Sequence, residues 1–229
     1  MRPLIVAIDG PAGAGKSTVS KLLARRLGLS FVDSGALYRT VALSARRQGI
    51  VTDDDAALAA LVGRIRISFK ATADENRVYL DGEDVSAEIR TPEISLLASA
   101  VSARPVVRAG LLGLQRRLAL EAPVGAVLEG RDIGTVVFPD ADLKFFLEAS
   151  PDVRARRRYE ELFQKGSESS LDAVLADQTK RDRDDSSRAV APLKPADDAV
   201  RVDSSGLPLS EVVQRLERVI RERLSARGA

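Results

Sequence analysis

The feature that most constrains how this chain folds is a glycine-rich segment between an apolar run and an amphipathic stretch. Residues 4–8 (LIVAI) are apolar and rich in β-branched side chains, as expected of a strand buried on both faces. Over residues 19–27, apolar side chains recur at helical spacing. Between them, residues 10–18 (GPAGAGKST) fit the phosphate-binding pattern G-x-x-x-x-G-K-[ST]. The strand–loop–helix context that this pattern requires is therefore present.

The residue types in this segment explain its expected chemistry. Glycines let the backbone turn its N–H groups inward without a Cβ blocking a phosphate, and the helix that follows adds partial positive charge. Lys16 is long enough to reach the β- and γ-phosphates of a nucleotide, and the Ser17 hydroxyl suits Mg²⁺. The residues expected to bind the phosphates of a nucleotide are Gly10, Pro11, Ala12, Gly13, Ala14, Gly15, Lys16, Ser17 and Thr18.

Composition limits the chemistry that the site can use. The 229 residues include no Cys and no His, which excludes thiolate nucleophiles and zinc–thiolate sites and removes the commonest general base. The 35 basic and 33 acidic residues are interspersed, so the net charge of +2 indicates neither a nucleic-acid nor a membrane partner. No apolar run is long enough to span a bilayer, and no cleavable signal is evident, so we expect a cytoplasmic protein.

The remaining pattern predicts an α/β fold. Apolar runs predict four further strands, at 29–32, 126–129, 143–147 and 200–203. Helical patterns connect them, at 36–48, 52–61 (capped by Thr52 or Asp53), 92–102, 105–120, from Pro151 to about 164, 171–184 and 209–226. Within 62–102, side chains alternate between apolar and polar around an Asp81-Gly82 turn signal. This alternation indicates an antiparallel insertion in a parallel-type chain.

Arginines gather next to the predicted phosphate site. Arg154, Arg157 and Arg158 share one face of the helix that Pro151 begins. Such a face is either solvated or a cationic lid, and the nearby phosphate-binding loop favours a lid over about 151–170. Arg39, in the first turns of its helix, presents the same choice between a solvated side chain and an anion-binding one.

Five segments together resemble the bacterial cytidylate kinase family, and they cover nearly the whole chain. They are GPAGAGKS (10–17), DSGALYR (33–39), GEDVSAEIR (82–90), EGRDIGTVVFP (129–139) and RAVAPL (188–193). The last two are much more specific than the phosphate-binding loop. Enzymes of this family phosphorylate CMP and dCMP with ATP and Mg²⁺, so the resemblance implies that activity.

The resemblance also implies an architecture: a P-loop NTPase-type, five-stranded parallel sheet flanked by helices. The chain would form a single domain, with its core at 1–61 and 103–229, a monophosphate-binding insertion at about 62–102 and a lid at about 151–170. We expect a monomer that binds these small-molecule substrates and neither nucleic acid nor a membrane.

The same resemblance implies a role for each matching residue. The residues that match positions around the pyrimidine are Ser34, Ser99, Arg108, Asp132 and Arg188. Arg39 and Arg131 match positions that hold the acceptor phosphate, and Arg181 and Asp185 match positions that hold the ribose. For transfer itself we expect Lys16, Arg131 and Arg157, with Ser17 at the metal.

Three other classes share some of these features. A GTPase switch would have the same loop but also an NKxD guanine motif, which the sequence lacks. A nucleic-acid-binding ATPase would need a basic surface with stacking aromatics, whereas aromatic residues make up 4% of this chain. Another small-molecule or nucleoside monophosphate kinase is the remaining alternative.

Overall fold

The chain folds into two compact units, one of which is continuous in sequence and lies between the two segments of the other. The computed structural model describes residues 2–71, 76–164, 166 and 168–228. One unit, here the sheet unit, comprises Met1–Val32 and Ala119–Ala229. The other, here the hairpin unit, comprises Asp33–Leu118. Each unit has a hydrophobic core of its own.

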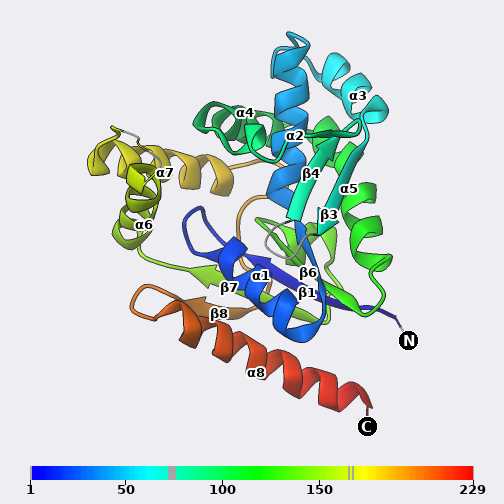
Figure 1. Ribbon diagram of the computed structural model, residues 1–229, viewed down its shortest axis with the longest axis vertical. Coiled ribbons are helices and arrows are strands. Elements are labelled where there is room, and N and C mark those ends of the chain that lie inside the picture. The colour runs from blue at the N-terminus through cyan, green and yellow to red at the C-terminus, as the bar shows by residue number, and fades with distance from the viewer. Residues whose placement is uncertain (1, 72–75, 165, 167, 229) are drawn as a thin grey trace. The chain divides into compact units, whose positions relative to one another are not determined.

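The sheet unit is built on a five-stranded parallel sheet in the order β2-β6-β1-β7-β8 (Figure 1). The strands are β1 (Leu4–Asp9), β2 (Ser30–Asp33), β6 (Gly125–Gly130), β7 (Leu143–Glu148) and β8 (Val200–Asp203). Every residue of β1 and β6 is buried, as expected of central parallel strands covered on both faces. This sheet confirms the predicted fold class.

Two helices cover one face of this sheet. They are α1 (Lys16–Leu27) and α8 (Leu209–Gly228) (Figure 1). Leu4, Val6 and Ile8 alternate along β1 and pack on this face against Leu23 of α1 and Leu216 of α8. Burial of this apolar face is what holds the amphipathic helices to the sheet.

The remaining elements of the sheet unit follow β6 and β7. A π-helical turn, η2 (Ile133–Val137), comes directly after β6 and was not predicted. Helices α6 (Pro151–Gln164) and α7 (Leu171–Ser186) connect β7 to β8 and pack against each other (Figure 1). Both begin at the residue that the sequence pattern predicted.

The hairpin unit combines helices with a small antiparallel sheet. Its elements are α2 (Ser34–Arg47), α3 (Asp55–Arg64), β3 (Ile67–Ala71), β4 (Asn76–Leu80), β5 (Glu83–Asp84), η1 (Glu88–Arg90), α4 (Pro92–Ser102) and most of α5 (Pro105–Leu120). Asp81 and Gly82 join β4 to β5 with φ of 50° and 92°, as a tight two-residue hairpin turn requires. The predicted alternation and turn are thus confirmed.

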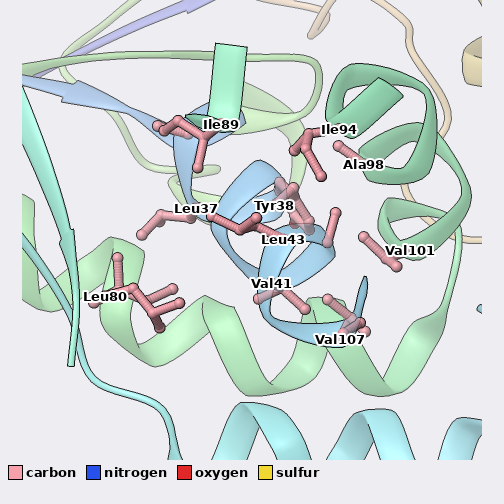
Figure 2. Packing of buried hydrophobic residues seen from close by; sticks show 14 of the residues in the cluster. Leu37, Tyr38, Val41, Leu43, Leu80, Ile89, Ile94, Ala98, Val101 and Val107 are labelled. Carbon is pink, nitrogen blue, oxygen red and sulfur yellow. The ribbon is translucent and has the colours of Figure 1, made fainter. Parts of the chain in front are cut away.

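Helix α2 forms the centre of the hairpin unit's core. Figure 2 shows Leu37, Val41 and Leu43 of α2 packed among side chains from α4 and α5, such as Val101 and Val107. The predicted insertion over about 62–102 lies inside this unit, which also includes α2 and α3. The boundary of a monophosphate-binding subdomain stays a prediction.

Two helix starts differ from the sequence-based expectation because of their capping residues. Helix α3 is capped by Asp54, which accepts from the Ala57 N–H at 2.9 Å, so the expected cap at Thr52 or Asp53 was wrong. Helix α2 starts at Ser34 because the Asp33 carboxylate caps it, accepting from the Ala36 N–H at 2.8 Å.

Within the described part of the chain, no single helix is both long enough and apolar enough to cross a membrane. Helices α4 and α5 meet those two criteria only when taken together, and they are bent by 100° relative to each other.

Candidate active site

The loop from Gly10 to Gly15 connects the carboxyl end of β1 to the first turn of α1. Gly13 and Gly15 have φ of 76° and 89°, which L side chains rarely adopt. A Cβ on Gly13 would lie 2.9 Å from the amide nitrogen of Gln178, whereas a Cβ on Gly15 would meet open space. The loop is therefore backed by protein at Gly13 and open at Gly15, where the N-terminus of α1 offers its N–H groups to an anion.

Lys16 follows this loop and is only 6% exposed. Its ammonium donates to the carbonyl of Pro11 at 2.7 Å, so the side chain curls back along the loop. Burial, and after it the positive charge of Arg131, lower the pKa of Lys16 to about 7. Phosphate oxygens placed here would offset both effects, which makes this lysine suited to an anionic ligand.

Ser17 lies beside a carboxylate that sequence reasoning did not include in the site. Its hydroxyl donates to Oε1 of Glu129, which lies near the carboxyl end of β6. A hydroxyl and a carboxylate are hard oxygen ligands of the kind that Mg²⁺ prefers. Among the described residues, no three Asp, Glu, His or Cys side chains are grouped so that they could hold a metal ion, so a metal here would need oxygens from its ligand or from water as well.

Asp9 shapes the turn that carries two of the predicted site residues. Its carboxylate accepts from the backbone N–H of Ile133 at 2.8 Å and of Gly134 at 2.7 Å. Burial raises the pKa of Asp9 to about 6 even though both N–H bonds favour the ionised form. Arg131 and Asp132 directly precede the residues that Asp9 holds, so Asp9 sets the position of their backbone.

Asp185 binds two of the arginines that were predicted to bind the acceptor. This carboxylate is 1% exposed and accepts from Arg131 Nε at 2.8 Å and from Arg188. Burial acts to raise the pKa of Asp185, but the charges of Arg131 and Arg188 outweigh it and hold the pKa below its usual range. Arg181 lies one turn earlier on α7. Four of the predicted acceptor-binding residues are thus brought together in the sheet unit.

Two arginines of α6 contact backbone carbonyls. Arg157 donates to the Ser204 carbonyl at 2.6 Å and to the Ser204 hydroxyl at 3.1 Å, just after β8. Arg154 donates to the Ala12 carbonyl of the phosphate-binding loop at 3.0 Å. Two arginines of the predicted cationic face therefore bind neighbouring segments of the protein. The role of Arg157 in phosphoryl transfer stays a prediction.

The hairpin unit carries the other predicted site residues. Ser34 and Arg39 lie at the start of α2, where Arg39 pairs with Asp33 at 2.9 Å. On α5, Arg108 is buried, donates to the Ser102 carbonyl at 3.1 Å and places its guanidinium 5.4 Å from the centre of the Tyr38 ring. Ser99 lies on α4, one turn before Ser102. This unit therefore offers cations and hydroxyls that could bind an anionic, planar ligand.

The sequence matches one family along almost its full length. A sequence model of the family described as "Cytidylate kinase" matches residues 6–222. A protein named cytidylate kinase from Geobacter sulfurreducens is 59% identical over 222 residues, which cover 97% of this chain and 94% of that protein. A second, from Geobacter sp. strain M21, is 54% identical over the same proportions.

Among solved structures, an uncharacterized protein from Eubacterium ventriosum superposes with a TM-score of 0.53 at 12% identity. The match covers 95% of this chain and 98% of that one. At this identity the likeness concerns the fold alone.

Proposed function

Because the chain belongs to the cytidylate kinase family, we propose that it transfers the γ-phosphoryl group of ATP to CMP and dCMP. The products are ADP and CDP or dCDP. The observation that carries the donor half of this proposal is the glycine loop that leads into the buried Lys16 at the start of α1. Such a loop cradles the phosphates of a nucleotide through its N–H groups.

In the transfer, a phosphate oxygen of CMP attacks the γ-phosphorus, and the bond to the β–γ bridging oxygen breaks. Negative charge spreads over the transferring group, so cations must be in place beforehand. Lys16 and Arg131 supply this charge from the sheet unit, and Arg157 is the α6 side chain proposed to join them. The acceptor phosphate is already an anion, so the reaction needs no strong general base, and a chain without histidine can perform it.

Ser17 and Glu129 are the residues that would hold Mg²⁺, because their oxygens already lie within hydrogen-bonding reach of each other. When bound, the ion neutralises charge on the phosphate oxygens. Ser17 lies in the first turn of α1 and Glu129 near the end of β6, so regular structure holds the backbone of both residues.

Acceptor binding is assigned to two groups of residues. In the sheet unit they are Arg131, Asp132, Arg181, Asp185 and Arg188. In the hairpin unit they are Ser34, Arg39, Ser99 and Arg108. Asp132 and Arg108 can read the amino donor and ring acceptors of cytosine, and the arginines balance the acceptor phosphate.

Three further parts of the proposal concern the protein as a whole. It acts as a monomer on small-molecule substrates, with α6 and the residues that follow it, about 151–170, as a lid that excludes water. Residues 165 and 167 of this segment lie outside the described part of the chain.

The test is an ADP-release assay with ATP and each of CMP, dCMP, UMP, AMP and shikimate. We expect kcat/KM for CMP and dCMP to exceed that for AMP and shikimate by about a hundredfold or more, the ratio that unsatisfied buried hydrogen bonds impose on a wrong base. Lys16→Ala, a control with unchanged acceptor residues, should abolish ADP release. Preference for AMP or shikimate would overturn the assignment to cytidylate.

A further inference from the structure

Arg154 lies on the proposed lid helix α6, but its guanidinium binds other residues of the sheet unit instead of extending into solvent. It is 4% exposed, although arginines on α6 would ordinarily be solvated. Its Nε donates to the Ala149 carbonyl at 2.9 Å, and its Nη1 donates to the Ala12 carbonyl at 3.0 Å. The same Nη1 lies 2.7 Å from Oδ2 of Asp182 on α7. One side chain therefore joins the end of β7, the phosphate-binding loop and α7.

Packing around Gly13 makes this junction tight. A Cβ on Gly13 would lie 3.0 Å from the Cβ of Arg154 and 2.9 Å from the side-chain nitrogen of Gln178. That nitrogen donates in turn to the Arg154 carbonyl at 3.4 Å. The loop thus rests directly on α6 and α7, and a displacement of either helix would change the support of Ala12 and Gly13.

Helix α7 carries acceptor-binding residues on the turn that follows Asp182. Asp185, three residues later, holds Arg131 and Arg188, and Arg181 directly precedes Asp182. Residues that are three apart lie on one face of a helix. A shift of α7 on acceptor binding would therefore be transmitted through Asp182 to Arg154 and the donor loop.

We propose that Arg154, through its ion pair with Asp182, is a positioning residue that couples donor binding at the loop to acceptor binding at α7. This inference rests on the proposed function. Arg154 can keep its contacts with Ala149, Ala12 and Asp182 together only when the loop and α7 hold one relative arrangement. A ligand that favours this arrangement at one end therefore favours it at the other, and the coupling is reciprocal.

The experiment measures the Kd of ADP by calorimetry, alone and with saturating CMP; ADP is used because it occupies the donor site without transferring a γ-phosphoryl group. The ratio of the two Kd values is the coupling factor. In the wild-type protein we expect CMP to tighten ADP binding by about 5-fold or more, within the usual range of coupled sites. In Asp182→Asn the ratio should fall to within about twofold of one, since the paired charge that transmits the shift is lost.

Two further variants separate coupling from folding. Arg154→Lys keeps the charge but cannot reach both carbonyls and Asp182 together, so it should lose coupling as Asp182→Asn does. Asp184→Asn is the matched control, because Asp184 lies on the same helix but pairs with the exposed Lys180 at 2.7 Å; it should keep the wild-type ratio. General damage to the fold would instead lower Tm and raise the Kd of ADP and the Kd of CMP when each ligand is measured alone.

The outcomes distinguish this inference from the proposed function. Wild-type turnover of CMP with a coupling factor near one would overturn the inference alone, as would an unchanged factor in Asp182→Asn. Absence of CMP turnover in the wild-type protein would overturn the proposed function and the inference with it. Coupling lost in both Arg154→Lys and Asp182→Asn but kept in Asp184→Asn would support the inference.

Discussion

At the scale of single residues, the protonation of Lys16 depends on whether an anion is present. Its pKa of about 7 reflects burial first and the nearby Arg131 second, while Glu129 and Asp9 act in the opposite direction. At pH 8 the free protein therefore holds this side chain largely neutral. Bound phosphates favour the charged ammonium and raise the pKa again.

We therefore predict that ADP binding at pH 8 takes up a proton from the solvent. Above pH 7.5 the terminal phosphate of ADP is itself ionised, so Lys16 is the group that gains the proton. Calorimetric titrations in two buffers of different ionisation enthalpy measure this uptake, and Lys16→Met should remove it. Equal proton uptake by the wild-type protein and the variant would contradict the role given to Lys16.

The same lowered pKa predicts how stability changes with pH in the absence of ligand. In the unfolded chain Lys16 returns to its ordinary pKa of 10.5, so between pH 7 and 10.5 unfolding binds a proton. The contribution of Lys16 to the free energy of unfolding therefore rises as pH increases across this range. Urea denaturation measures this effect. From pH 7 to pH 9 the free energy of unfolding of the wild-type protein should rise relative to that of Lys16→Met. The same change with pH in both proteins would contradict the prediction.

Asp132 allows base recognition to be separated from a structural role. It is buried and precedes η2, but its side chain makes no capping bond to that turn; its carbonyl accepts from Val136 and Val137 instead. Asp132→Asn should therefore lower kcat/KM for CMP by about 5- to 150-fold, the equivalent of about 1–3 kcal/mol, and leave the Kd of ADP unchanged. A variant that loses Tm but keeps its selectivity for CMP over UMP would show a structural role only.

At the scale of elements, the phosphate-binding loop contains three glycines with positive φ, and two of them, Gly13 and Gly15, have different surroundings. Gly13 faces Arg154 and Gln178, whereas Gly15 faces open space. We predict that Gly15→Ala costs about 1–3 kcal/mol of unfolding free energy from backbone strain. Gly13→Ala should cost about 1–3 kcal/mol more, because its Cβ overpacks against α6 and α7. Urea denaturation measures the free energy of unfolding of both variants. Equal losses would contradict the prediction, because they would show that α6 and α7 accommodate the added Cβ at Gly13 without further destabilisation.

At the scale of the whole molecule, each unit depends on its own core, and α8 completes the core of the sheet unit. On this helix Leu216 is fully buried, whereas Leu224 is 37% exposed. Leu216→Ala should lower the free energy of unfolding by about 2–5 kcal/mol, and Leu224→Ala by about 1 kcal/mol or less. Thermal and urea unfolding measure both, and a similar loss at the two positions would mean that α8 packs differently from the described arrangement.

Local patterns in the sequence were sufficient for most of the fold. The apolar run of β1 and the glycine loop predicted the first βα unit, and the start of α6 at Pro151 and of α7 at Leu171 was confirmed. The Asp81-Gly82 turn was confirmed with its positive φ values. These features depend on residues within a few positions of one another, so their physical cause is visible in the sequence itself.

Only the tertiary structure decided how the site is supported. Asp9 holds residues 124 and 125 positions later, Ser17 meets Glu129 across 112 positions, and Arg154 reaches Ala12 across 142. The arginines of α6 matched a cationic face by spacing, yet Arg154 and Arg157 donate to backbone carbonyls. Helical spacing specifies which residues share a face but not what that face meets. That is decided when the sheet brings the ends of β1, β6 and β7 together, and buried polar groups then find partners that no local pattern identifies.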